Sequence, residues 1–179
     1  MTFLEHLPTL IDPMPRRIIW SYGEWQPIYR TLPSHVQLVQ GIPDLPDTSD
    51  TPLLLIIDDQ MMETDARVTK LFTKGSHHRN ISVIYIVQNL FDKNREHRTI
   101  SLNAHYLVVF KNPRDGSQIM HLAKQMYPGQ SQYMKEAFEL ATREPHGYLL
   151  VDLKQCTPEG LRLRSRIFPG ERQEVYVHK

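Results

Sequence analysis

The chain has 179 residues, of which 40% are hydrophobic and 23% charged, and this composition suits a globular protein of one domain with a sizeable core. Its formal net charge is +1, so any nucleic-acid surface must be a local patch rather than a property of the whole molecule. The single Cys156 excludes a disulfide framework and a cysteine-rich zinc site, and no apolar run is long enough to span a membrane, so we expect a soluble intracellular protein.

The first half of the chain is expected to alternate short helices and strands. A helix is predicted over 2–11, where prolines end it, and a turn with a short helix over 23–30. Strands are predicted over 17–20, 36–39 and 53–57, and a surface loop over the proline-rich residues 41–52. A further helix over 63–74 is expected to end at Gly75, because glycine readily adopts the left-handed conformation that ends helices.

The second half continues the alternation. Strands are predicted over 81–88 and 106–111, and helices over 115–127 and 131–143 on either side of Pro128-Gly129. Two last strands, 147–153 and 161–168, have the spacing of an antiparallel pair. Strands that alternate with helices indicate an α/β fold with a mostly parallel sheet and an antiparallel C-terminal end.

The segment Leu53–Asp59 is the most informative stretch of the sequence. Five apolar residues run directly into Asp58 and Asp59, as in a strand that is buried on both faces and delivers acids at its carboxyl end. Open α/β sheets bind ligands at that end. In a nucleotide hydrolase the first acid holds Mg²⁺ and the second activates the attacking water. A buried strand that merely ends in an acidic turn is the alternative.

The next strand offers two further candidates for phosphate chemistry. Gln88 follows a buried strand and could orient the attacking water, although an amide that simply caps the strand fits equally well. Arg79 in the basic loop Lys74–Asn80 could contact nucleotide bound to a neighbouring subunit, and Arg98 is the second candidate for this role. Arginines in such loops are also commonly just solvated.

Residues 93–114 are rich in basic side chains that could follow a phosphate backbone. Lys93, Arg95 and Arg98 are the candidate DNA contacts, and a solvated face is the alternative. An alternative hypothesis is a metal-dependent nuclease. Asp115 and Asp152 would be its acids and Lys154 its lysine, in the sequence Asp152-Leu153-Lys154. That short pattern occurs by chance in many chains, and Asp152 is better explained as the end of a structural strand.

The acid pair, the basic loop and the strand that ends in Gln88 resemble the FtsK–HerA superfamily of ATPases. Within it they are most similar to the poxvirus-type genome-packaging ATPases and to relatives in Polinton/Maverick and adintovirus elements. The similarity covers roughly residues 16–169 and is carried mainly by Leu53–Asp59, 78–83, Gln88, 98–103 and 106–115. It implies a P-loop NTPase sheet of the RecA/FtsK type.

Roles follow from this resemblance residue by residue. Asp58 would ligate Mg²⁺ of a bound ATP, Asp59 would activate water, Gln88 would sense the γ-phosphate and Arg79 would act in trans. The family forms homo-oligomeric rings that move double-stranded DNA, normally into a viral capsid, in the host nucleus or a viral factory.

One departure from the family pattern is large. None of the eight glycines is followed by lysine, so the phosphate-binding sequence G-x-x-x-x-G-K-[ST] is missing. We therefore expect residues 1–179 to be a single, N-terminally truncated ATPase domain that is inactive alone and lacks its first strand and P-loop. The alternative is an inactive remnant that only binds DNA or partner subunits.

Overall fold

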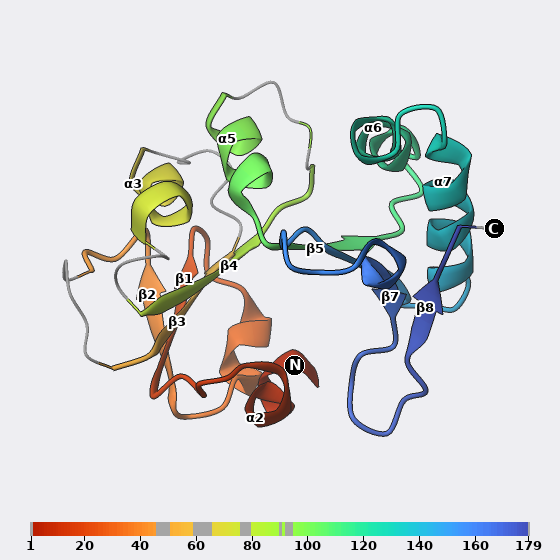
Figure 1. Ribbon diagram of the computed structural model, residues 1–179. Coiled ribbons are helices and arrows are strands. Elements are labelled where there is room, and N and C mark those ends of the chain that lie inside the picture. Colours follow the sequence, from red (N-terminus) through yellow and green to blue (C-terminus); the bar gives the residue numbers. More distant parts are fainter. Residues whose placement is uncertain are drawn as a thin grey trace. The chain divides into compact units, whose positions relative to one another are not determined.

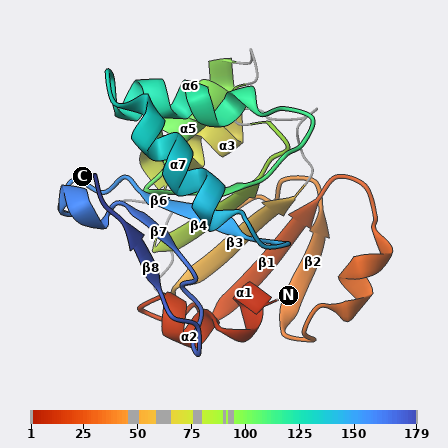
Figure 2. The same ribbon diagram turned by 90° about the vertical axis from the view of Figure 1, so that its right-hand side faces the viewer.

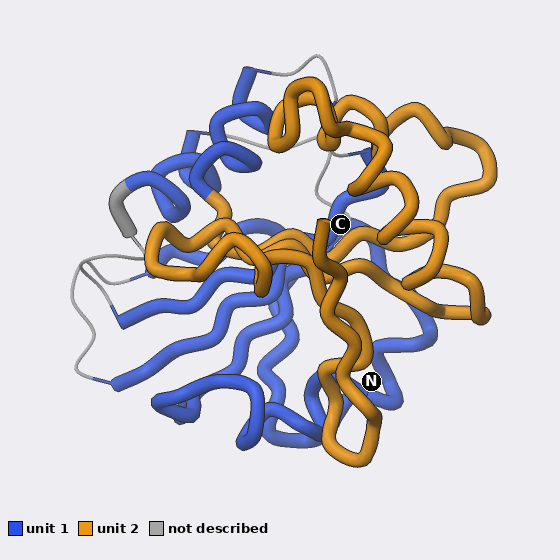
Figure 3. The backbone as a smooth tube through the Cα atoms, turned by 45° about the vertical axis from the view of Figure 1, so that its right-hand side comes forward, with its two compact units in different colours: residues 1–103 blue, residues 104–179 orange. Residues whose placement is uncertain are grey.

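The computed structural model describes residues 2–45, 51–58, 66–75, 80–89, 91 and 95–178. The chain forms two compact units, residues 1–103 and residues 104–179, each with its own sheet (Figure 3). The α/β class predicted from the sequence is confirmed, as are the parallel strands and the antiparallel C-terminal strands. The antiparallel strands form a separate four-stranded sheet.

The sheet of unit 1 has four parallel strands in the order β2-β1-β3-β4. The strands are β1 (Arg17–Tyr22), β2 (Val36–Gln40), β3 (Leu53–Asp58) and β4 (Ile81–Ile86). β3 lies between β1 and β4, and its residues 53–57 are all buried. An unbroken apolar run is what an interior strand of a parallel sheet requires, because helices cover both of its faces.

The side chains of β3 alternate between two hydrophobic clusters. Leu55 and Ile57 pack with Val68 of α3 (Ala66–Lys70) and with Ile100 of α5 (Arg95–Asn103). The other face packs against the N-terminal helices α1 (Thr2–Glu5) and α2 (Leu7–Leu10) (Figure 1). α3 continues as the π-helical turn η3 (Leu71–Gly75), and a 3₁₀ helix, η1 (Pro27–Thr31), follows β1.

Unit 2 is an antiparallel sheet in the order β5-β6-β7-β8 with two helices. Its strands are β5 (Tyr106–Phe110), β6 (Tyr148–Asp152), β7 (Leu163–Ser165) and β8 (Glu174–Tyr176). The helices α6 (Ser117–Met126) and α7 (Ser131–Ala141) connect β5 to β6, and a 3₁₀ turn, η4 (Glu159–Leu161), precedes β7 (Figure 2).

Several elements differ from the sequence expectation. The helix expected over 2–11 is divided at His6, because Pro8 cannot donate the hydrogen bond that would continue it. The strand expected over 161–168 is only β7, and it ends before Arg166, whose φ of 54° is left-handed. Helix α5 and strand β8 were not expected.

Candidate functional site

Asp58 ends β3 at the carboxyl edge of the parallel sheet. In the strand register it lies opposite Tyr22 of β1 on one side and Ile86 of β4 on the other. Gln88 follows Ile86 by two residues and is exposed. The fold therefore brings Asp58 and Gln88 to the same edge, where parallel α/β sheets bind their ligands.

Tyr29 holds the Asp58 carboxylate, which sequence reasoning did not anticipate. Its hydroxyl donates a hydrogen bond to Asp58 Oδ2 over 3.0 Å, and the residue is only 2% exposed. η1 begins with Pro27, whose fixed φ suits the first position of a helical turn, and this short helix turns Tyr29 back toward the sheet. The contact spans 29 residues, so no local pattern announces it.

Tyr29 is also the centre of an aromatic cluster. Its ring centroid lies 5.2 Å from that of Tyr22, 5.5 Å from that of Trp25 and 6.0 Å from that of Trp20. The rings are tilted or edge-to-face, which are favourable arrangements for aromatic pairs. Both tryptophans of the chain and these two tyrosines lie within residues 20–29, and that concentration was the available sequence signal.

The donor set fits one part of a magnesium–nucleotide site. Asp58 Oδ2 accepts the Tyr29 hydroxyl, and among the described residues no hydrogen bond to Oδ1 is found. Magnesium in nucleotide hydrolases is held by one or two carboxylates together with phosphate and water oxygens, so one partly buried carboxylate is sufficient from the protein. Within the described part of the chain, no group of three His, Cys, Asp or Glu residues could hold a metal alone.

The remaining candidates divide between described and undescribed residues. Asp59, Arg79 and Lys93 lie outside the residues that the structure describes. Arg95 and Arg98 are both exposed on α5, three residues apart and thus neighbours on one helix surface. His97, between them in the sequence, is instead buried, and its ring packs against Tyr85 of β4 at 5.9 Å.

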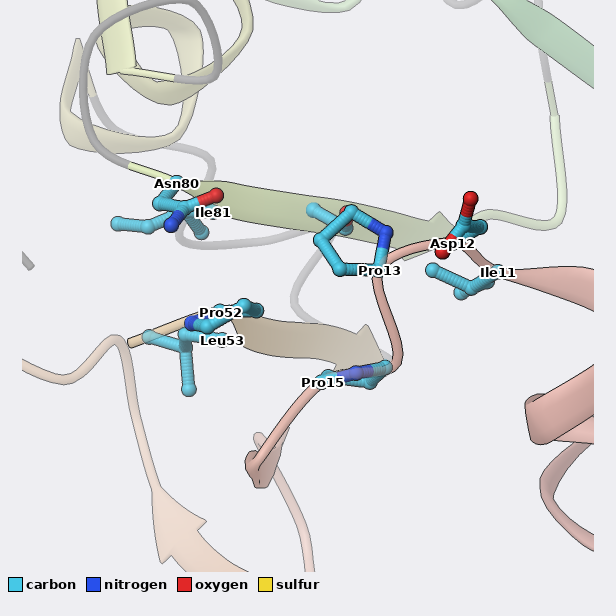
Figure 4. Close-up of a pocket in the computed structure, with 9 residues that line it drawn as sticks. Ile11, Asp12, Pro13, Pro15, Pro52, Leu53, Asn80 and Ile81 are labelled. Atoms are coloured by element: carbon cyan, nitrogen blue, oxygen red, sulfur yellow. The ribbon is translucent and has the colours of Figure 1, made fainter. Parts of the chain in front are cut away.

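A hollow of about 120 Å³ lies at the opposite edge of the same sheet. It is lined by residues that include Asp12 and Pro13, together with the amino ends of β3 and β4 at Leu53 and Ile81 (Figure 4). Parallel sheets bind ligands at their carboxyl ends, so this hollow is not part of the Asp58 site.

The three residues of the nuclease pattern have separate partners in unit 2. Asp115 accepts hydrogen bonds from Ser117 and Gln118, which hold the pKa of its exposed carboxyl below the usual range. Asp152 forms an ion pair with Arg164 over 2.6 Å.

Lys154 is the third residue of the nuclease pattern, and its contacts do not indicate a metal site shared with Asp115 and Asp152. It places its Nζ 5.1 Å from the ring centroid of Tyr106. Asp152 is the register partner of Tyr106 at the start of β5, whereas Asp115 follows the far end of that strand. The fold therefore gives Asp152 a structural ion pair and does not bring the three residues to one metal.

Comparison of the chain with models of known protein families, with curated proteins and with solved structures gives no match. In the described part of the chain, no helix is both long enough and apolar enough to cross a membrane.

Proposed function

We propose that unit 1 is the catalytic sheet of a DNA-translocating ATPase related to the FtsK–HerA superfamily, and to its genome-packaging members in particular. The observation that carries the proposal is the position of Asp58. It ends the fully buried interior strand β3, and the next strand of the sheet, β4, leads to Gln88 at the same edge. An acid and an amide on neighbouring parallel strands match the metal and sensor positions of such ATPases.

The roles of the residues follow from their places along the two strands. Asp58 would hold Mg²⁺ with the carboxylate oxygen that Tyr29 does not occupy. Bound Mg²⁺ would neutralise negative charge on the phosphates of ATP. Asp59 would accept a proton from the attacking water, and Gln88 would orient that water. Arg79 would act on nucleotide bound to a neighbouring subunit.

The proposed site is one half of a complete ATPase site. The sequence carries the acids and the amide but no G-x-x-x-x-G-K-[ST], so the groups that surround the phosphates must be added to it for hydrolysis. In the assembled motor the partners would be further copies in a ring, double-stranded DNA and a viral capsid. Arg95 and Arg98 on the exposed surface of α5, together with Lys93, would contact the DNA.

Phosphate release from Mg·ATP, with and without duplex DNA, tests the proposal. Three proteins are compared: the chain itself, the chain joined to an upstream P-loop segment of a packaging ATPase, and the joined form with Asp59→Asn. We expect only the joined form to hydrolyse ATP, with stimulation by DNA. Asp59→Asn should lower its rate by roughly 10²- to 10⁴-fold, because the general base is lost.

The outcomes distinguish the motor hypothesis from its alternatives. Hydrolysis that Asp59→Asn leaves unchanged would show that Asp59 is not the general base. If the joined form folds and binds DNA but does not hydrolyse ATP, the motor assignment fails, and the alternative of a remnant that only binds DNA or partner subunits is the better account.

A further inference from the structure

The two faces of the unit 2 sheet are very different. On one face Leu149, Val151 and Leu163 are completely buried, and α7 packs over β6 and β7. On the other face, alternate residues of the edge strand β5 are open to solvent. Tyr106 is 45%, Val108 49% and Phe110 59% exposed. The exposed part of this face lies along β5, because the register partners Leu150 and Asp152 on β6 are only 8% and 4% exposed. This exposed edge, called the open face below, is apolar and aromatic.

Basic side chains lie at both ends of the row formed by Tyr106, Val108 and Phe110. At one end the ammonium group of Lys154 lies 5.1 Å from the ring centroid of Tyr106, and a hydrogen bond with Tyr106 raises the pKa of that ammonium group. At the other end a hollow of about 360 Å³ opens beside Phe110 and is lined also by Lys111, Arg143 and His146.

The charge balance near the row favours an anionic ligand. Glu144 is the single acid among the residues that line the hollow. Residues 104–179 as a whole contain eleven Lys and Arg against eight Asp and Glu. A surface that combines exposed rings with cations on both sides suits a ligand that is itself both flat and negatively charged.

We propose that the open face of the unit 2 sheet binds single-stranded nucleic acid, with bases stacked on Phe110 and Tyr106 and phosphates bound by Lys111, Arg143 and Lys154. A base presents a flat ring to an aromatic side chain only when it is unpaired, so these rings select a single strand over a duplex. The hollow of about 360 Å³ beside Phe110 is lined by both Lys111 and Arg143, so a phosphate of the same strand would meet two cations there.

The geometry also sets a minimum ligand length. Tyr106 and Phe110 are four residues apart on one strand, which corresponds to about 13 Å. Bases that stack directly on each other are only ~3.4 Å apart. The two rings therefore hold bases that are not neighbours. At the stacked spacing, ~13 Å is about four base steps, so the site spans about five nucleotides, within the range known for single-strand binding surfaces.

This site is separate from the proposed ATPase site. It uses residues of unit 2 only, whereas Asp58, Gln88, Arg95 and Arg98 belong to unit 1. Its test needs neither ATP nor a P-loop, so either proposal can fail while the other stands.

The test is fluorescence anisotropy of a labelled oligo(dT) of about 16 nucleotides titrated with the full chain at low salt. We expect Phe110→Ala and Tyr106→Ala each to weaken binding roughly 5- to 100-fold, because one base loses its stacking partner. Phe110→Trp should retain the affinity. Lys111→Ala should reduce the slope of log affinity against log salt by about 0.7, as expected for one lost phosphate contact on a single strand.

Val108→Ala is the matched control, since it alters an exposed apolar side chain between the two rings without removing a ring. We expect it to change the affinity less than twofold. A dinucleotide should bind much more weakly than the oligo(dT), and Phe110→Ala and Tyr106→Ala should not weaken any binding of a duplex of the same length. Because Phe110 and Val108 are exposed, these variants should retain the circular dichroism spectrum of the wild type.

Three results would overturn the proposal. The first is the absence of oligo(dT) binding by a folded chain. The second is binding that survives both Phe110→Ala and Tyr106→Ala. The third is concentration-dependent dimerisation in sedimentation experiments that Val108→Ala and Phe110→Ala both abolish, because the face would then be covered by a second copy of the chain.

Discussion

Replacing Tyr29 by phenylalanine tests the hydrogen bond that its hydroxyl donates to the Asp58 carboxylate. Phenylalanine retains the ring, so the packing against Trp20, Tyr22 and Trp25 is kept. The substitution removes only the hydroxyl, which donates to Asp58 Oδ2 over 3.0 Å. The change in stability therefore reports on the hydroxyl of Tyr29 rather than on the packing of its ring.

The size of the effect follows from the burial of the two partners. A hydrogen bond between neutral groups contributes about 0.5–1.5 kcal/mol, and one to a charged group about 1.5–3 kcal/mol. Tyr29 is almost fully buried whereas Asp58 is half-buried, so water partly replaces the lost bond. We expect Tyr29→Phe to lower the free energy of unfolding by about 1.5 kcal/mol. Tyr29→Ala should cost about 3–5 kcal/mol, because the ring is lost as well.

Urea unfolding followed by tryptophan fluorescence measures both values. The chain has two tryptophans, Trp20 and Trp25, and both contact Tyr29, so the signal comes from this site. A double-mutant cycle with Asp58→Ala then gives the coupling between the two residues. We expect a coupling energy of about 1 kcal/mol, since contacting residues in one hydrogen-bonded pair do not behave additively.

Two results would refute this reasoning. If Tyr29→Phe changes the stability by less than about 0.3 kcal/mol, the hydroxyl does not hold Asp58 in solution. If the single effects of Tyr29→Phe and Asp58→Ala simply add, the two side chains act independently. In either case Tyr29 would not fix the orientation of Asp58 at the edge of the sheet.

Three further predictions follow from the packing and the ion pairs. Leu55→Ala, at a fully buried position of β3, should destabilise unit 1 by about 2–5 kcal/mol in the same urea assay, whereas Leu102→Ala, 68% exposed, should stay within about 0.5 kcal/mol. Asp152→Ala leaves the partly buried Arg164 without its carboxylate and should cost about 2–4 kcal/mol. Loss of protection from amide hydrogen exchange in β6 measures this effect, and an unchanged exchange rate would contradict the structural role of Asp152. The pKa of Asp115 is lowered in the folded chain, so its carboxylate stabilises the start of α6 above pH 3.8 and loses that effect as the pH falls below it. The stability difference between wild type and Asp115→Ala should therefore shrink on acidification, and a difference independent of pH would contradict the hydrogen bonds to Ser117 and Gln118.

The sequence alone was sufficient for the elements whose side chains follow one local rule. Residues 53–57 form an unbroken apolar run, and such a run is stable as a strand only between two covering layers. The positions of Asp58 and Gln88 at one edge followed from the same logic, because consecutive parallel strands end on the same side of a sheet. These predictions needed only the order of apolar and polar residues along the chain.

Elements held by distant contacts were not predictable in this way. α5 buries only His97 and Ile100, so its sequence has no clear helical repeat of apolar residues, and it is positioned by packing on β4 and α3. β8 has three residues that are paired with β7, and the hydroxyl of Tyr133 donates to the backbone carbonyl of Tyr176. The Tyr133–Tyr176 contact leaves no local signal, since the two residues are 43 positions apart.

The same distinction applies to the two proposed sites. The sequence determined that an acid pair follows a buried strand and that the amide Gln88 follows another. Only the tertiary structure decided that Tyr29 holds Asp58 and that Tyr106 and Phe110 share the open face of a sheet. Strand order and register fix which side chains meet and which face helices cover, and both depend on contacts between segments that are separated along the chain.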